Sequence, residues 1–376
     1  MARINPNFAQ EIKKYGARDF EACFNCGTCT ATCGLTEQNA NFPRKFVRSG
    51  VLGQREDLLN SKEIWLCYAC GDCSTNCPRQ AAPAEYMAAV RRYAIANYEP
   101  TGLTKLIFKS NPFSIFLTLF LAVILGFFLL TIKPDNIVSR WIFEWMPYEI
   151  LHTMGLIIFS ITGISMVWGI ISMWRKLSSG LDQKARQKTA KISEAFQKTG
   201  DELATMRRYR NCDTEDESFW NTKKGYERPW FIHWSVMWGF IGLLLATILD
   251  FMFKDPATDI WFPSRLLGTL AGLLLIYGTS MALYYRLTKI TKAYSSTKLA
   301  DWMFLGFLFV AGITGFWLEA SITLNASNST NQIVFVIHTI ISMQLVLLFA
   351  FSKFAHAIYR PLALFHYYYH APQKQK

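Results

Sequence analysis

Eight of the nine cysteines of this chain fall into two short runs with the same spacing. Residues 23–34 read CFNCGTCTATCG and residues 67–78 read CYACGDCSTNCP, so each run is C-x2-C-x2-C-x3-C. Three thiolates at this spacing can hold three irons of a cubane [4Fe–4S] cluster, and one more cysteine completes the ligand set. The runs therefore predict two [4Fe–4S] clusters with the ligands Cys23, Cys26, Cys29, Cys33, Cys67, Cys70, Cys73 and Cys77.

Two other chemistries use grouped cysteines. A tetrahedral zinc site takes four ligands, usually from two C-x2-C pairs, so the third closely spaced cysteine of each run would be surplus. A disulfide framework is expected in small secreted domains, whereas the N-terminal stretch MARINPNFAQEIKK has no apolar signal core. The spacing therefore favours iron–sulfur clusters over both. The ninth cysteine, Cys212, lies in a polar stretch and is predicted to be a free thiol.

The fourth cysteine of each run is predicted to ligate the cluster of the other run, as in two-cluster ferredoxins. One cluster would then have the ligands Cys23, Cys26, Cys29 and Cys77, and the other Cys67, Cys70, Cys73 and Cys33. The second run ends in Cys77-Pro78, as the two-cluster motif does, but the first ends in Cys33-Gly34. This departure alters the turn after the first run without removing a ligand.

The residues around the two runs have helical patterns. The stretch FPRKFVRSGVLGQREDLLNSKEIWL between the runs has apolar residues at helical spacing and little strand alternation, and AEYMAAVRRYAIANY after the second run is similar. We therefore expect residues 1–105 to form an α-helical ferredoxin domain with two clusters, and not a short β-rich one.

Residues 106–376 have the patterns of a membrane domain. Hydrophobic residues make up 51% of the 376-residue chain and charged residues only 18%, which is low for a soluble protein. Six stretches are apolar over the roughly 20 residues that a helix needs to cross a bilayer; they lie near residues 113–132, 150–174, 230–249, 266–285, 302–319 and 333–351. The predicted fold class is therefore all-α, a helical ferredoxin domain followed by six transmembrane helices of the cytochrome b type.

The distribution of positive charge indicates the orientation. The net charge of +12, from 39 Lys+Arg and 27 Asp+Glu, would by itself also fit nucleic acid or an acidic partner. Basic residues gather in the loop 175–229, in RLTKITKAYSSTK and after the sixth span, whereas TLNASNSTN has none. The positive-inside rule thus predicts a cytoplasmic location for these loops, both termini and the cysteine domain, without nucleic acid. The long loop should contain a helix near residues 181–210, either solvated or docked on the cluster domain or a partner.

Four of the six histidines lie within or at the ends of the predicted spans. His338 and His356 are eighteen residues apart, which is five turns of one helix, so both would project from one face about 27 Å apart. In the predicted orientation His233 lies at the depth of His356, and His152 at the outer depth of His338. Two histidines on facing helices of a bundle can hold haem b, whereas a single histidine can simply donate to a carbonyl group. The pairing predicts haem b at His233–His356 and a second haem at His152–His338.

Taken together, these motifs resemble those of known redox complexes. The cysteine domain is similar to the C subunit of heterodisulfide reductase, and the membrane part to that enzyme's E subunit and to the nitrate reductase gamma subunit family. Their fusion resembles the C subunit of quinone-interacting membrane-bound oxidoreductase complexes. In the gamma subunit family one helix supplies a ligand to each haem, whereas the third span here has only His233, with Leu243 ten residues on. His152 is assigned to the outer pair for this reason.

The resemblance implies an electron relay in the cytoplasmic (inner) membrane. It would connect menaquinone to cytoplasmic partner subunits that carry flavin and iron–sulfur clusters, with adenylylsulfate reductase as the soluble enzyme in sulfur respiration. The chain has no Gly-rich dinucleotide fingerprint after a strand, so chemistry on soluble substrates is expected on the partners. Two alternatives remain open, a membrane-anchored ferredoxin without haem and a redox-sensing or transporting membrane protein.

Overall fold

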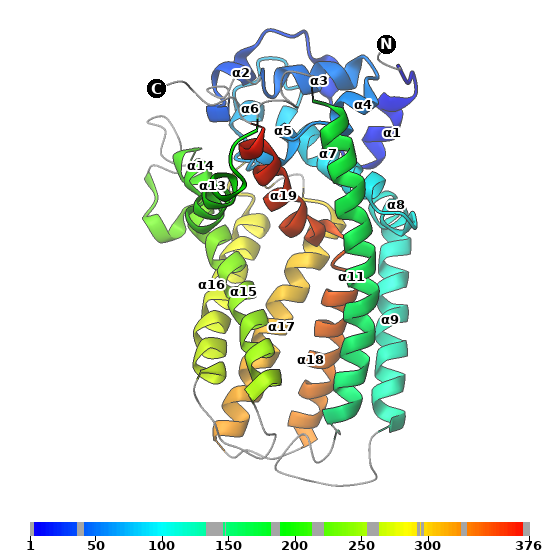
Figure 1. Cartoon of the computed structure of the whole chain (residues 1–376), viewed down its shortest axis with the longest axis vertical. Coiled ribbons are helices and arrows are strands. Elements are labelled where there is room, and N and C mark those ends of the chain that lie inside the picture. The colour runs from blue at the N-terminus through cyan, green and yellow to red at the C-terminus, as the bar shows by residue number, and fades with distance from the viewer. Residues whose placement is uncertain are drawn as a thin grey trace.

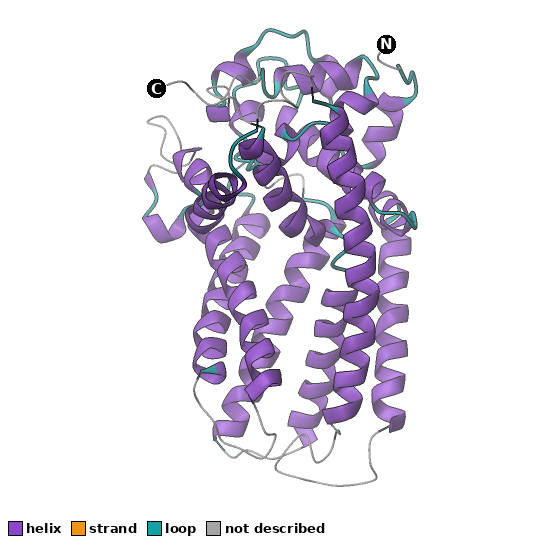
Figure 2. Ribbon diagram, in the orientation of Figure 1, coloured by secondary structure: helices purple, strands orange, loops and turns teal. Residues whose placement is uncertain are grey.

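The chain folds into an elongated helical molecule with short helices at one end and long helices in the rest. The structure, a computed structural model, describes residues 4–35, 41–132, 146, 148–181, 189–212, 222–253, 263–291, 294, 297–324 and 329–370. All regular elements in these ranges are helical, so the predicted all-α class is confirmed for them (Figure 2). The short helices of the cysteine region gather at one end, and the long helices extend away from them as a bundle (Figure 1).

The cysteine-bearing end is built around one long helix. This helix, α7 (Pro83–Tyr98), buries most of its residues and contacts five shorter ones: α1 (Phe8–Lys14), α3 (Arg44–Val51), α4 (Arg55–Leu59), α5 (Glu63–Leu66) and α6 (Asp72–Thr75). A further four-residue helix, α2 (Thr28–Ala31), contacts α6. Each of the two cysteine runs thus contributes one short helix, and these two helices lie against each other.

The bundle consists of six long helices. They are α9 (Asn111–Ile132), α11 (Tyr148–Ser179), α15 (Pro229–Phe253), α16 (Ser264–Thr288), α17 (Leu299–Thr323) and α18 (Ser329–Leu347). Each contains a stretch long and apolar enough to cross a membrane, which confirms the six predicted spans. Large apolar side chains such as Phe116, Val123 and Phe127 of α9 are exposed. Surfaces of this kind are stable in lipid, because every backbone group of a helix is satisfied internally.

Helix α11 extends beyond the predicted end of its span. Its 32 residues cover about 48 Å at about 1.5 Å per residue, more than the roughly 30 Å of a hydrocarbon core. The additional turns contact α7 of the cluster domain. Leu177 of these turns and Met173 just before them are buried in the same core as the cluster-domain helices. The cluster domain is therefore packed on the bundle, and not attached to it only by a linker.

Helices α15 and α16 approach each other through glycines. A Cβ added to Gly239 would lie 2.6 Å from the backbone nitrogen of Leu275, and one added to Gly278 would lie 2.9 Å from the carbonyl oxygen of Ile232. Small residues at helix interfaces allow the close backbone approach on which association within a membrane depends. This contact holds the first turns of α15, which carry His233, in a defined position.

The sixth span does not continue to His356. Helix α18 ends at Leu347, and after residues 348–352 the chain forms a 3₁₀ turn, η6 (Lys353–Ala355), followed by a separate helix, α19 (His356–Tyr369). The hydroxyl of Ser352 accepts a hydrogen bond from Phe354 N (3.2 Å), which caps this turn. The prediction of one continuous helix with His338 and His356 five turns apart was therefore wrong. The chain turns here because α19 packs on the cluster domain.

Helix α19 lies between the cluster domain and the bundle (Figure 1). The ring centre of Tyr359 is 5.6 Å from that of Trp65 and 5.4 Å from that of Tyr98, and all three side chains are almost fully buried. The predicted helix of the long loop is present as α13 (Ile192–Thr205) and α14 (Arg207–Cys212), and α13 packs on α19. Residues 182–188 and 213–221 of that loop lie outside the described residues.

Candidate functional site

The two cysteine runs have the same local conformation. Gly27 and Gly71 occupy equivalent positions with φ of 96° and 99°, and α2 and α6 begin directly after them. Asn25 and Ala69, two residues earlier, also have positive φ. Left-handed residues at these positions turn the backbone sharply between the first and the third cysteine of each run. The repeated sequence thus becomes a repeated binding loop.

The first group of thiols surrounds a cavity of about 370 Å³, measured with its open mouth. Its lining includes Cys23, Cys26 and Cys29 of the first run together with Cys77 of the second. Burial raises the pKa of Cys29, and the neighbouring thiolates of Cys23, Cys26 and Cys77 raise it further. The exposed Cys26 accepts a hydrogen bond from Thr28 Oγ1 (3.3 Å), which lowers its pKa. The structure therefore brings the last cysteine of the second run to the first run.

The second group of thiols is more buried. Burial raises the pKa of Cys73 well above its usual value, and the next contributions come from Cys67 of the same run and Cys33 of the first run. The amide of Ala69 donates to Cys67 Sγ at 3.3 Å. In the described part of the chain no three Cys, His, Asp or Glu side chains converge closely enough for one metal ion. Cys33 of the first run thus lies among the thiols of the second run.

Two arginines hold the backbone at Cys67. Arg91 Nη1 of α7 donates to the Cys67 carbonyl at 3.0 Å, and Arg360 of α19 donates to the Leu66 and Cys67 carbonyls at 3.2 and 3.4 Å. The Arg91 guanidinium also lies 3.8 Å from Cys67 Sγ. Two positive charges beside a cysteine thiolate stabilise an anionic cluster. Arg360 therefore joins the second group of thiols to the helix that begins with His356.

His233 and His356 face each other at the opposite end of this connection. Their ring centres are 6.3 Å apart. A metal–imidazole bond is about 2 Å and the nitrogen lies about 1 Å from the ring centre, so two axial imidazoles on one iron have centres about 6 Å apart. His356 Nδ1 bonds to the Lys353 carbonyl (2.6 Å), and His233 Nδ1 contacts Met206 Sδ (3.4 Å). Each Nε2 thus remains available as a ligand, oriented by the bond of the other nitrogen.

Aromatic side chains connect the second group of thiols to this histidine pair. Tyr68, next to Cys67, stacks on Tyr209 with ring centres 4.9 Å apart, and Tyr209 lies 6.1 Å from the His233 ring. Arg360 lies 3.4 Å over the ring of Tyr68, whose hydroxyl donates to Glu202 at 2.6 Å. Sequence reasoning missed Tyr209, Glu202 and Arg360, because no local motif marks them. The position of Tyr68 directly after Cys67 in the second cysteine run is a sequence signal that could have identified it.

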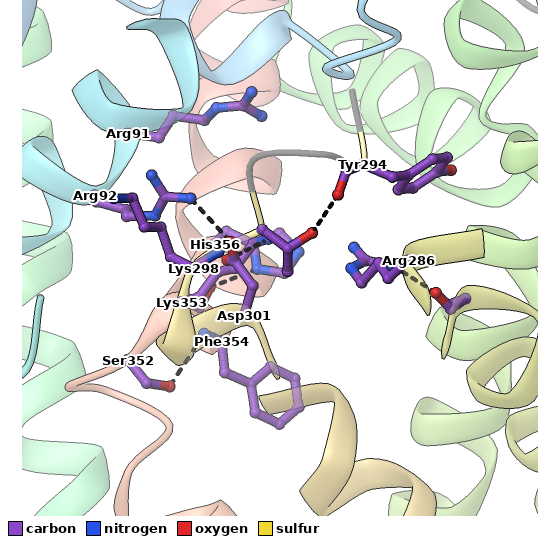
Figure 3. Close-up of polar contacts among 12 residues, drawn as sticks. Arg91, Arg92, Arg286, Tyr294, Lys298, Asp301, Ser352, Lys353, Phe354 and His356 are labelled. Carbon is purple, nitrogen blue, oxygen red and sulfur yellow. Dashed lines mark hydrogen bonds and ion pairs between the residues drawn. The ribbon is translucent and has the colours of Figure 1, made fainter. Parts of the chain in front are cut away.

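A group of basic side chains lies around Asp301 and His356 (Figure 3). Asp301 at the start of α17 binds Arg92 Nη2 (2.9 Å) through one oxygen and Lys353 Nζ (2.7 Å) through the other. Further positive charge acts on His233 or His356 from Arg91, Arg286 and Arg360. Asp301 is the one acid among the residues labelled in the close-up, so positive charge is in excess. Two acidic groups on a bound cofactor, such as haem propionates, would balance this excess.

Replacing Asp301 with alanine is expected to destabilise the join between the cluster domain and the bundle. The variant leaves the buried Arg92 without its partner and also removes the partner of Lys353, whose side chain is 36% exposed. Removing one member of a buried ion pair costs about 3 kcal/mol of unfolding free energy. Thermal unfolding of the detergent-solubilised chain should show a lower midpoint. Glu194→Ala, which breaks the exposed Glu194–Lys198 pair, should leave the midpoint unchanged. Equal midpoints for the two variants would contradict the assignment.

The outer histidines lie on different helices. His338 of α18 has its Nδ1 2.9 Å from Thr314 Oγ1 of α17, and its ring lies against Gly315, where an added Cβ would be 3.0 Å from His338 Cε1. His152 is on α11, which packs on α18. The structure brings the ring centres of the inner pair within 6.3 Å at an interplanar angle of 57°, and the outer haem stays a prediction.

Comparison with known proteins divides the chain in two. The family model described as a 4Fe-4S dicluster domain matches residues 19–81, and that of citrate utilization protein B matches residues 136–375. The first match supports the predicted iron–sulfur clusters. No solved structure gives a significant match.

The individual relatives align with either about a quarter or most of the chain. A protein of Archaeoglobus profundus that is named for its likeness to the heterodisulfide reductase C subunit is 36% identical over 27% of this chain and 58% of its own length. The C subunit of the H(2):CoB-CoM heterodisulfide,ferredoxin reductase of Methanothermobacter thermautotrophicus is 29% identical over 24% and 49%. The chain thus spans about half the length of these relatives. Citrate utilization protein B of Escherichia coli is 24% identical over 80% of this chain and 79% of that protein.

Proposed function

The chain belongs to the citrate utilization protein B family, whose model covers well over half of it, and on this premise we propose that it is a membrane subunit that relays electrons between a quinone and cytoplasmic partners. Its cluster domain is related to subunits of heterodisulfide reductases, which are oxidoreductase complexes. In the proposed relay, one haem b is bound by His233 and His356, and two [4Fe–4S] clusters by the eight cysteines. Menaquinone is the proposed quinone.

The observation that carries the proposal is the distance of 6.3 Å between the rings of His233 and His356. The two imidazoles come from α15 and α19, which no local pattern connects. Burial lowers the pKa of His356 to about 4, so its imidazole is neutral at pH 7, the form that binds a metal. Haem and [4Fe–4S] clusters exchange single electrons, which suits a relay between a two-electron quinone and a soluble enzyme.

The residues between the cofactor positions orient and connect them. Arg360 fixes the Cys67 backbone from the helix that carries His356, and Tyr68 and Tyr209 exclude water from the space between Cys67 and His233. Crossed ligation, with Cys77 at the first cluster and Cys33 at the second, is supported by the two groups of thiols described above. In this arrangement the exposed first cluster faces the soluble partner and the buried second cluster faces the histidine pair.

The first experiment is a dithionite-reduced minus air-oxidised visible spectrum of the purified full chain, with haem and non-haem iron measured together. About eight non-haem irons and one b-type haem per chain are expected. Two haems would make His152 and His338 a second ligand pair. Clusters without haem would contradict the proposal and favour a membrane-anchored ferredoxin or a redox sensor.

Replacing Arg360 with methionine is expected to lower the reduction potential of the second cluster. The variant removes one positive charge beside Cys67 while retaining much of the side-chain volume, and reduction adds negative charge there. A decrease on the order of 50–100 mV is expected from Coulomb's law at this range, measured by redox titration with electron paramagnetic resonance. Arg175→Met, which removes an exposed charge from α11, is the matched control. A potential equal to that of the control would show that Arg360 does not act on the cluster.

The soluble partner can belong to one of two classes. The resemblance to quinone-interacting complexes implies a flavin and iron–sulfur protein linked to adenylylsulfate reductase, in sulfur respiration. The relative named for citrate utilization aligns over most of the chain, whereas the heterodisulfide reductase relatives align over about a quarter. We therefore propose a second candidate partner, a cytoplasmic enzyme that oxidises citrate or a related carboxylic acid. Mixing the reduced chain with each class of enzyme and following cluster oxidation distinguishes the two.

The orientation belongs to the same proposal. The positive-inside pattern puts the cluster domain, the loop 175–229 and both termini in the cytoplasm. Cysteine-reactive labelling of intact spheroplasts, with single cysteines introduced in RLTKITKAYSSTK and in TLNASNSTN, should modify only the second stretch. Labelling of the first stretch and not the second would show that the chain has the opposite orientation.

A further inference from the structure

A second cavity of the described chain lies within the membrane part, on the cluster-domain side. It encloses about 470 Å³ of space when the solvent at its open mouth is included. Its walls come from α8 (Leu103–Lys109), α9, α17, the last turn of α18 and the segment that joins α18 to η6. Most of the lining is apolar, including Leu117, Phe307 and Leu345, and three hydroxyls interrupt it, those of Ser114, Thr118 and Ser352.

The three hydroxyls differ in what they can offer a ligand. Ser114 Oγ donates to the Ile107 carbonyl at 2.7 Å, and Thr118 Oγ1 donates to the Ser114 carbonyl at 2.9 Å. Ser352 Oγ instead accepts a hydrogen bond from Phe354 N, so its own proton can be donated into the cavity. Ser352 takes this position because the chain leaves the helix after Leu347. The break in the sixth span thus places one hydrogen-bond donor in an otherwise apolar space.

The cavity adjoins the histidine pair. Phe304 lines it, and the ring centre of Phe304 is 6.4 Å from that of His356, with the two planes at 90°. Ser352 precedes His356 by only four residues in the chain. A ligand in the cavity would therefore be separated from the His356 imidazole by a single aromatic ring.

We propose that this cavity binds the head group of a quinone, with Ser352 donating to one of the two ring oxygens. The inference rests on the proposed relay and locates its membrane substrate on the same side as the clusters. On oxidation the two O–H bonds of the quinol break and the ring becomes the quinone. Two protons would be released to solvent, and the two electrons would pass one at a time to the soluble partner through the one-electron groups that His233, His356 and the cysteines would hold. Electrons then enter and leave on one side, so turnover builds no membrane potential.

The first test reduces the space in the cavity by enlarging a side chain on one wall. Ala300 of α17 lines it, and Ala300→Leu should slow haem reduction by menadiol about tenfold or more, because added methylenes in a filled site cost 1–3 kcal/mol, roughly. Stopped-flow absorbance measures this rate, and fluorescence quenching of an alkyl-hydroxyquinoline N-oxide measures binding directly. Gly306→Leu is the matched control on the same helix, since an added Cβ there meets nothing within 4 Å. Haem content and dithionite reduction should match the wild type in both variants.

A second variant leaves the volume of the cavity intact. Ser352→Ala removes the proposed donor together with the cap that its oxygen provides for Phe354 N, and it should weaken binding of the N-oxide about fivefold, the effect of one hydrogen bond. An unchanged b-type spectrum of the variant would show that loss of the cap leaves His356 in place. If Ala300→Leu and Gly306→Leu react with menadiol and bind the N-oxide equally well, the cavity is not the quinone site. A wild-type haem that dithionite reduces and menadiol does not would overturn the proposed relay, and the quinone site with it.

Discussion

Replacing His356 with alanine is expected to remove the b-type spectrum while leaving about eight non-haem irons per chain. An iron held by two imidazoles loses its defined position when one is removed, because the protein provides the axial ligands and little else at the metal. The expected loss is the whole reduced-minus-oxidised difference of the haem. His233→Ala should give the same result, since the two rings face each other at 6.3 Å.

The matched controls for this prediction are the outer histidines. His338→Ala and His152→Ala should leave the spectrum of the inner haem intact, because His338 lies on α18 and contacts Thr314 and Gly315 of α17, and neither of these helices carries His233 or His356. A haem content that falls by half in the controls would establish the second haem. A haem content that stays complete in His356→Ala would contradict the assignment of the inner pair.

Two double cysteine variants are expected to lose different amounts of iron. In crossed ligation, Cys29→Ala with Cys77→Ala removes two ligands from one cluster, and about four irons should remain. Cys73→Ala with Cys77→Ala removes one ligand from each cluster, and both should be lost. The physical reason is the position of Cys77, which lines the cavity of Cys23, Cys26 and Cys29.

Iron analysis together with electron paramagnetic resonance of the reduced chain measures this difference. Cys212→Ala is the control and should retain about eight irons, since no cluster is predicted to use it. The reverse pattern, with iron retained in the Cys73 and Cys77 variant, would show that each run ligates its own cluster.

The sequence by itself determined the features that depend on residues close together along the chain. The spacing of the cysteines identified the two binding loops, helical periodicity identified the class of the cluster domain, and the length of the apolar stretches identified six spans. Each of these patterns is complete within about 25 residues, so local chemistry and the bilayer thickness are enough to read it.

The tertiary structure alone decided how these parts meet. The break at residues 348–352 was not predicted, because it arises where α19 turns to pack Tyr359 against Trp65 and where Lys353 reaches Asp301. Arg360 contacts the carbonyl of Cys67 across 293 positions of the chain, a contact that no periodicity marks. Side chains so distant in sequence are brought together by burial of a shared core, and such burial depends on the whole fold and not on any one segment.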